Sequence, residues 1–453
     1  MHKHNPSLFV MSLAFGFSSL LGSACSPMDI GSQRAPATTP FDAAPADPTA
    51  NRSRIGIIWA SWNPSHFQNE GAYLDRVASF QVKRVSLVPA YFINTYAEGI
   101  VDNPSNTPTS AQQKAVLKEL LRRGFWINYR PHIDPYKFTL SADAQQYVTS
   151  DPGGKDWRGK FDRLDPMKSD YKDKVILHCL RTLAEAISEI RSAEPALVIH
   201  KVRFDLGAEL MDSEVLFTDH WLQLLQTVRA TIASQYPTIA PYIELSHNFC
   251  HHLEYLKRLP GHLDYLGRIN PDGQVKDADL FVDRMAPEAR IELGQYIAGL
   301  DAFSISQYMP LDVMAGSDGP SADSVRNALL HHEKTFFQEV LVGELGMAAE
   351  DIPPFHVGEF GIGIRGLAAP NVWDAKAWAP TGKLPSAATQ REQSQLAMEG
   401  VALYMKDRSA QANTLMLWLG GAPYDVFELN SYSTGAYNEG AVQAITTYLT
   451  ENP

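Results

Sequence analysis

Eight short apolar runs alternate with stretches of helical periodicity along this chain of 453 residues, and that alternation leaves few folds open. Apolar runs bounded by Gly and Pro are typical of buried strands. Strands that alternate with helices predict a parallel sheet, because a parallel connection needs a crossover that a helix can provide. The expected strands are 55–60, 82–88, 125–129, 202–206, 243–246, 300–306, 355–357 and 414–419.

Eight such strands predict an α/β fold, a (β/α)8 TIM barrel that forms a single domain with loop insertions over residues 54–453. The alternative is a doubly wound open sheet, but no Gly-x-Gly-x-x-Gly motif follows the first strand. Residues 250–289 are poorly periodic and receive no assignment. The expected helices are 74–80, 110–121 with Ser110 as its cap, 170–190, 221–233, 324–340, 390–406 and 439–449.

The N-terminal segment has the form of a secretory signal. Lys3 precedes an apolar run over residues 8–21 that is short for a membrane span, and small residues lead to Cys25. Residues 1–25 are expected to be a signal peptide, with Cys25 resembling the lipidated residue of a bacterial lipoprotein. Residues 26–53, rich in Pro, Ala and Thr, predict a disordered linker. The protein is therefore expected to be an outer-membrane or cell-surface lipoprotein, or else periplasmic or extracellular.

Charge and motif content limit the partners. A net charge of −12 argues against nucleic acid, and no Gly-Lys-Ser/Thr phosphate loop occurs. The adjacent histidine pairs at 251–252 and 331–332 lack the i, i+4 spacing of a helical metal site. No metal and no cofactor are expected. We expect a monomer that touches a membrane only through a lipid anchor.

Two glutamates follow buried strands in the same manner. Glu209 comes after the fourth strand in Gly207-Ala208-Glu209, and Glu359 after the seventh in Gly358-Glu359. The carboxyl ends of barrel strands form the active face, so the two side chains are expected to face each other there. Such a pair suits sugar cleavage, in which one carboxyl group acts as acid/base and the other as nucleophile. Glu209 could instead start a helix or join a buried salt bridge, and Glu359 could brace a turn.

The chain resembles the clan A glycoside hydrolases, most closely family 113, the β-mannanases. That resemblance implies that Glu209 is the acid/base and Glu359 the nucleophile. In the related family 5 an Asn usually precedes the acid/base, whereas this chain has Ala208. The segments that carry the resemblance are Ser86-Leu87-Val88-Pro89, Tyr129-Arg130-Pro131-His132-Ile133-Asp134, Trp157-Arg158-Gly159, Gly207-Ala208-Glu209-Leu210 and Gly358-Glu359-Phe360-Gly361.

Aromatic and polar residues near the strand ends are candidates for sugar contacts, because an aromatic ring suits the apolar face of a pyranose. Ordinary packing is the alternative for each of them. The substrate-binding candidates are Trp59, Trp62, His132, Trp157, His247, Asn248, Tyr308 and Trp418.

The expected function is that of a retaining glycoside hydrolase acting on β-1,4-linked mannan or a related β-glycan, with a polysaccharide or oligosaccharide as its partner. One alternative is a surface glycan-binding protein that has lost catalysis. Another is a hydrolase of glucan or of a cell-wall amino sugar.

Overall fold

The structure is a computed structural model. It describes residues 54–61, 67, 70–93, 100–101, 107–135, 139–140, 147–148, 164–249, 287–307, 321–361, 387–407, 414–418 and 439–451. The expected signal peptide, Cys25 and the expected linker lie outside the described residues. All described residues belong to one compact unit, residues 48–453.

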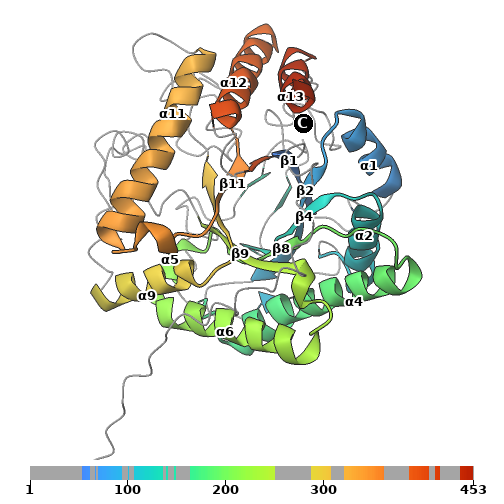
Figure 1. Ribbon diagram of the computed structural model, residues 1–453, viewed down its shortest axis with the longest axis vertical. Helices are drawn as coiled ribbons and strands as arrows, with labels where there is room; N and C mark the ends of the chain where they lie inside the picture. Colours follow the sequence, from blue (N-terminus) through green and yellow to red (C-terminus); the bar gives the residue numbers. More distant parts are fainter. Residues whose placement is uncertain are drawn as a thin grey trace, which may run out of the picture. The chain divides into compact units, whose positions relative to one another are not determined.

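Eight parallel strands form a closed ring, which confirms the predicted barrel (Figure 1). Each strand pairs with the next along the ring. The ring closes because β12 pairs with β1, with Ile55 opposite Leu415. In order, the ring strands are β1 (Ile55–Ser61), β2 (Arg84–Ile93), β4 (Trp126–Tyr129), β8 (Val202–Ala208), β9 (Ile243–Phe249), β10 (Phe303–Gln307), β11 (Phe355–Phe360) and β12 (Leu415–Leu417).

Short strands extend this ring at its edge. β3 (Ile100–Val101) runs antiparallel to β2, and β5 (His132–Pro135) runs parallel to it. β6 (Thr139–Leu140) and β7 (Tyr147–Val148) form a separate antiparallel pair.

Helices surround the strands (Figure 1). The long ones are α1 (Glu70–Ser79), α2 (Ser110–Arg122), α4 (His178–Ala193), α6 (Thr218–Gln235), α9 (Pro287–Ala298), α11 (Ala322–Thr335), α12 (Ala387–Asp407) and α13 (Glu439–Glu451). The short ones are α3 (Ser169–Tyr171) and α5 (Met211–Leu216), with 3-10 turns at Ala240–Tyr242 and Ala349–Asp351. A wider π turn, Lys172–Leu177, precedes α4, and another, Phe336–Glu344, follows α11.

One helical expectation needs correction, and one helix begins in a segment that received no assignment. The cap of α2 is Thr109 and not Ser110, because the Thr109 side chain accepts from the amide of Gln112 while the Gln112 side chain accepts from the amide of Thr109. This reciprocal arrangement is a capping box. Helix α9 begins inside the segment that received no assignment; its apolar residues Leu293, Tyr296 and Ile297 are buried.

Among the residues that the structure describes, buried apolar side chains form a large core and a small separate cluster. The large core contains side chains from the outer faces of the strands and from the helices, such as Phe204 and Leu206 of β8 and Trp221 of α6. A small separate cluster, Ile58, Val88 and Met416, comes from β1, β2 and β12, with Ala60 and Trp418 packed against it. Residues on a strand alternate between its two faces, so this small cluster belongs to the inside of the ring.

The opposite wall of the ring interior is polar. At the start of the strands, Arg203 of β8 reaches across to β11, where its Nη2 lies 2.9 Å from Nε2 of His356. The backbone amide of Thr414 donates to His356 Nδ1 at 3.1 Å. Burial and the guanidinium groups of Arg203 and Arg84 hold the pKa of His356 well below its ordinary value. His356 is therefore a neutral histidine inside the barrel at neutral pH.

Candidate active site

Both strands that lead to the predicted glutamates carry one extra residue just before the glutamate. On β8, Asp205 pairs with Ser246 but the next pairing joins Ala208 to Asn248, so β8 has one more residue than β9 in this interval. On β11, Val357 pairs with Ile305 and Glu359 with Ser306, which leaves Gly358 as the extra residue. Such bulges bend a strand and redirect the side chains that follow. The glycines of the two motifs thus accompany a change in strand direction.

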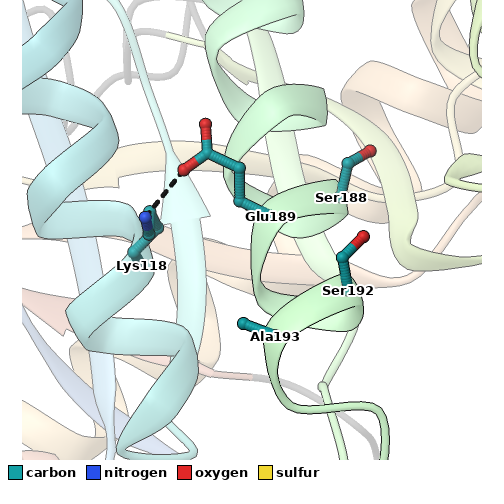
Figure 2. A pocket seen from close by; sticks show the side chains of 5 residues that line it. All are labelled: Lys118, Ser188, Glu189, Ser192 and Ala193. Carbon is teal, nitrogen blue, oxygen red and sulfur yellow. Dashed lines mark hydrogen bonds and ion pairs between the residues drawn. The ribbon is translucent and has the colours of Figure 1, made fainter.

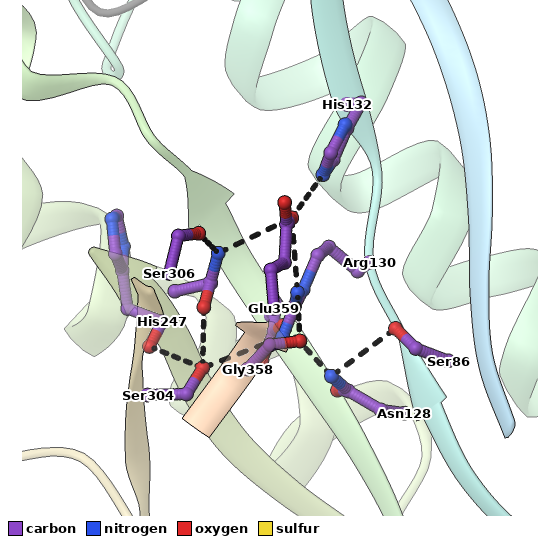
Figure 3. Close-up of polar contacts among 11 residues, drawn as sticks. Ser86, Asn128, Arg130, His132, His247, Ser304, Ser306, Gly358 and Glu359 are labelled. Carbon is purple, nitrogen blue, oxygen red and sulfur yellow. Dashed lines mark hydrogen bonds and ion pairs between the residues drawn. The ribbon is translucent and has the colours of Figure 1, made fainter. Parts of the chain in front are cut away.

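The carboxylate of Glu359 is buried, and three nitrogen-bearing side chains converge on its Oε1 (Figure 3). Arg130 Nη1 donates to this oxygen at 3.2 Å, and Asn248 Nδ2 donates at 3.4 Å. His132 Nε2 lies 3.2 Å from the same atom. Hydrogen bonds from a guanidinium and an amide stabilise a negative charge and fix its position. The three contacts therefore fix the position of this carboxyl oxygen.

Arg130 is itself fixed by groups from three strands. Its Nε donates to Asp205 Oδ2 at 2.5 Å, its Nη1 to the carbonyl of Gly358 at 2.9 Å, and its Nη2 to Ser304 Oγ at 3.3 Å. Burial lowers the pKa of Arg130, but the carboxylates of Asp205 and Glu359 outweigh it and raise this pKa above its ordinary value. Arg130 is therefore a permanent cation beside Glu359.

Gly358 has no side chain, and polar side chains around Glu359 occupy the position that its Cβ would take. A Cβ built on Gly358 would lie 2.0 Å from Asn248 Oδ1, 2.4 Å from Ser304 Oγ and 2.8 Å from Arg130 Nη2. Ser304 Oγ donates to that same Asn248 oxygen at 2.8 Å, while Asn248 Nδ2 donates to Ser306 Oγ at 2.9 Å. Only glycine permits these side chains to approach the backbone so closely.

Glu209 lies at the end of β8 in an unusual backbone conformation. Its φ is +55°, in the left-handed region, and its side chain is fully buried. A non-glycine residue in this conformation is strained by about 1–3 kcal/mol and persists only where its surroundings hold it. The amide of Glu209 donates to the carbonyl of Asn248 at 2.8 Å.

Asn248 connects the two glutamates. Its backbone carbonyl holds the Glu209 amide, and its side chain donates to the Glu359 carboxylate. Arg130 lies close enough to both glutamates for each to raise its pKa. The structure thus brings Glu209 and Glu359 to the same end of the barrel and to the same buried polar network.

The other predicted site residues fall into three groups. His132 and Trp418 lie together near Glu359, with stacked rings whose centroids are 6.2 Å apart, and Trp418 is partly exposed. Trp59 packs into the large core, stacked on Tyr73 and edge-on to Phe67, away from the polar network. The candidates that lie outside the described residues are Trp62, Trp157 and Tyr308.

His247 lies on the outer side of the barrel wall. Its Nε2 is 2.8 Å from Glu214 Oε1, and its Nδ1 is 2.8 Å from the hydroxyl of Tyr296. Its ring stacks on Phe249 and meets Trp221 edge-on. The structure therefore does not bring His247 to the carboxylate of Glu359, whereas its neighbour Asn248 contacts it.

Sequence reasoning assigned no role to Arg130 and treated Asp205 as structural. Alternation along β4 places Asn128 and Arg130 on the same face, and Asn128 Nδ2 also donates to Asp205 Oδ2, at 3.1 Å. A buried arginine at a strand end, in the segment Tyr129-Arg130-Pro131, was the available signal. Its partners lie on three other strands, so the sequence could not identify them.

A shallow pocket also lies on the outside, between α2 and α4 (Figure 2). It is lined by Lys118, Ser188, Glu189, Ser192 and Ala193. Glu189 accepts from Lys114 and Lys118 at 2.8 Å and 2.7 Å, and these hydrogen bonds lower its pKa to about 2. The charged groups of this pocket thus bind one another on the helical surface, and no strand end contributes to it.

Two further searches concern the described part of the chain alone. Among its helices, none is both long and apolar enough to cross a bilayer. Within the same residues, no group of three or more His, Cys, Asp and Glu side chains is placed to hold a metal ion.

No protein-family model matches the sequence, and no curated protein matches it. Among solved structures, a glycoside hydrolase family 113 β-1,4-mannanase is similar at a TM-score of 0.48 and 13% identity, over 88% of this chain and 98% of that one. The family 113 β-mannanase from Alicyclobacillus acidocaldarius is similar at a TM-score of 0.44 and 15% identity, over 89% and 98%.

A family 5 mannosidase from Rhizomucor miehei is similar at a TM-score of 0.42 and 10% identity, over 88% of this chain and 92% of that one. The likeness to these two family 113 β-mannanases and to the family 5 mannosidase thus extends over most of the chain, at low identity. The barrel itself is established by the strand pairing described above.

Proposed function

We propose that this protein is a retaining glycoside hydrolase that cleaves β-1,4-linked mannan or a related β-glycan. The observation that carries the proposal is the double role of Asn248, which binds the backbone of Glu209 and the carboxylate of Glu359. Two buried glutamates at one end of a barrel, joined through a single residue, suit the pair of carboxyl groups that such enzymes place about 5–5.5 Å apart.

In the first step the Glu359 carboxylate attacks the anomeric carbon while Glu209 gives its proton to the glycosidic oxygen. The bond between this carbon and oxygen breaks, and the sugar becomes covalently linked to Glu359. In the second step Glu209 takes a proton from water, the water oxygen attacks the same carbon, and Glu359 leaves as a carboxylate. Two inversions at one carbon give net retention.

The surrounding residues have separate tasks in this mechanism. Arg130 and Asn248 hold the attacking oxygen through their hydrogen bonds to Oε1. Trp418, partly exposed beside His132, offers an aromatic face for the sugar at the cleavage point. Mannan is named first because the strand-end segments resemble family 113 β-mannanases.

The test uses variants of the two glutamates and a substrate panel. Soluble mannan, cellulose, xylan and peptidoglycan are incubated with the enzyme, reducing ends are counted, and NMR identifies the anomer that forms first. We expect β-anomeric product from the wild type. Glu209→Ala should lower turnover of the glycan by at least about 100-fold, since general acid–base catalysis contributes that much or more. Glu359→Ala should lower it further, while both variants still bind the glycan.

Azide separates the two roles. In Glu359→Ala, azide takes the place of the attacking carboxylate and should give an α-glycosyl azide from a dinitrophenyl glycoside. In Glu209→Ala, azide attacks the covalent intermediate from the other face and should give a β-glycosyl azide. Glu333→Gln, a buried carboxylate outside the polar network, is the control and should behave as the wild type. Wild-type turnover by either glutamate variant would refute the assignment.

A glycan-binding protein without catalysis would bind a polysaccharide of the panel and release no reducing ends from any of them. That outcome would replace the hydrolase with the alternative function.

A further inference from the structure

We propose that a buried chain of three side chains outside the barrel wall positions the acid/base. The chain consists of Glu214 on α5, His247 on β9 and Tyr296 on α9, and we call it the Glu214 clamp. The proposal rests on the function proposed above, because it assigns the clamp to Glu209. None of the three residues lies at the Glu359 carboxylate, so they act through the backbone and are positioning residues.

The clamp holds the peptide plane that follows Glu209, the residue with the strained backbone. The conformation of Glu209 is set by the two rotatable bonds that separate its preceding and following peptide planes. The Glu209 amide is in the preceding plane and donates to the Asn248 carbonyl at 2.8 Å. The Leu210 amide is in the following plane and donates to Glu214 Oε1 at 2.9 Å. The two hydrogen bonds together keep Glu209 at its φ of +55°.

The acceptor oxygen of Glu214 is in turn fixed by His247. His247 Nε2 lies 2.8 Å from Glu214 Oε1, and Tyr296 Oη lies 2.8 Å from His247 Nδ1. Burial, followed by the nearby Tyr171 and Glu214, raises the pKa of Tyr296 well above its ordinary value. Tyr296 therefore keeps its proton. Glu214 Oε1 already accepts from the Leu210 amide, so the hydrogen between the imidazole and this oxygen is carried by His247 Nε2.

Adjacent residues of β9 thus hold Glu209 from two directions. Asn248 binds its amide directly, and His247 acts through Glu214 on the amide that follows. Gly207 makes this possible, because a Cβ there would lie 2.4 Å from His247 Cε1 and 2.9 Å from the Trp221 ring. Gly207, two residues before Glu209, is therefore the position at which the imidazole of His247 packs against β8.

The clamp buries a carboxyl group deep in the protein. Glu214 is 1% exposed, and His247 and Tyr296 are fully buried. A buried carboxylate is costly unless its hydrogen bonds compensate for lost hydration. Here one oxygen accepts from both the Leu210 amide and the imidazole. An apolar side chain would pack in this position but would leave the Leu210 amide and the imidazole without their acceptor.

The experiment measures how strongly catalysis depends on the leaving group. A dinitrophenolate departs without help, whereas a phenolate needs a proton from a correctly placed acid. Glu214→Leu removes the acceptor, and Glu214→Gln keeps an acceptor oxygen in the same place. Each variant is assayed with dinitrophenyl and phenyl β-mannobiosides and with the matching β-cellobiosides.

We expect Glu214→Leu to lower kcat/KM for the phenyl glycosides by about 100-fold, within the range that general acid catalysis contributes, and to change the dinitrophenyl value by less than about fivefold. Glu214→Gln should restore most of the phenyl activity. The matched control is Glu333→Leu, because Glu333 is a buried carboxylate that accepts from the Tyr404 hydroxyl at 2.8 Å on another part of the barrel. It should affect both leaving groups equally.

An equal loss for both leaving groups in Glu214→Leu would overturn the proposal, as would no loss for either. If this variant does not fold, hydrogen exchange of the Glu209 and Leu210 amides is measured in Glu214→Asp, whose shorter side chain draws the acceptor oxygen away from the Leu210 amide. Faster exchange than in the matched control Glu333→Asp supports the clamp, and unchanged exchange overturns it. A wild type that cleaves neither aryl series refutes the hydrolase and the catalytic role of the clamp, while the exchange measurement still decides whether Glu214 holds the Glu209 backbone.

Discussion

At the scale of individual atoms, the absence of a side chain at Gly358 allows the polar groups around Glu359 to pack as they do. The side chains of Asn248, Ser304 and Arg130 all approach the position that a Cβ would occupy. Two of these, Asn248 and Arg130, hold the Glu359 carboxylate. Any side chain at Gly358 therefore displaces the groups that fix the proposed nucleophile, although it would not touch the nucleophile itself.

Gly358→Ala should destabilise the protein and lower activity together. Overpacking of a buried site costs about 1–3 kcal/mol, so the free energy of unfolding measured in urea should fall by roughly that amount. Turnover should fall as well, because Arg130 or Asn248 must move. Gly71→Ala is the control, since the nearest atom to its new Cβ is 3.7 Å away on a flexible Arg123 side chain and alanine favours helix. A Gly358→Ala variant with wild-type stability and turnover would contradict this account.

Neighbouring residues on one strand cannot both serve a site on one face, and this limits what the sequence predicts at the residue scale. His247 and Asn248 were proposed together, yet alternation sends Asn248 inward to Glu359 and His247 outward to Glu214. The same alternation along β1 places the side chain of Ile58 inside the ring and that of Trp59 outside it. The pairs were visible in the sequence, but which member faces inward depends on the position of the strand in the ring.

The bulges on β8 and β11 work at the scale of whole elements. Each inserts one residue just before a glutamate and turns the strand end. The strand and helix periodicity indicated the barrel, and the glycine-flanked glutamates indicated the candidate site at one end of it. The extra residues could not be read from the chain, because a bulge is defined by the register of two strands that are distant in sequence.

The capping box of α2 can be tested at this scale. Thr109→Ala removes the side-chain oxygen that accepts from the Gln112 amide, and loss of such a cap costs about 1 kcal/mol. The free energy of unfolding should fall by that amount. Thr109→Ser keeps the hydroxyl and should lose little. Equal stability of the alanine and serine variants would show that the cap does not support the helix.

One histidine inside the barrel, His356, contributes to the response of the whole molecule to pH. Folding keeps His356 neutral at a pH where the unfolded chain protonates it, because burial and two arginines lower its folded pKa. Below the ordinary histidine pKa of about 6.5 the unfolded state therefore binds more protons than the folded state. The stability contributed by neutral His356 is present above this pH and is lost as the pH falls.

His356→Gln should flatten this acid limb. In the wild type, His356 alone can lower the free energy of unfolding by up to about 1.4 kcal/mol for each pH unit below about 6.5. Urea unfolding at several pH values between 7.5 and 5 measures the slope, whatever the absolute stability of the variant. His331→Gln, at an exposed histidine, should keep the wild-type slope. An unchanged slope in His356→Gln would show that the folded protein protonates this residue normally.

The pairing of Ile55 with Leu415 also has a consequence for the order of assembly. The ring is sealed by the strand that leaves the ribosome last among the eight, so every earlier intermediate has two open edges. Unpaired strand edges invite pairing with other chains. Contacts this distant in sequence also form slowly. A nascent chain must therefore remain protected from its neighbours until β12 arrives, and the barrel end that carries Glu209 and Glu359 is complete only at that final moment.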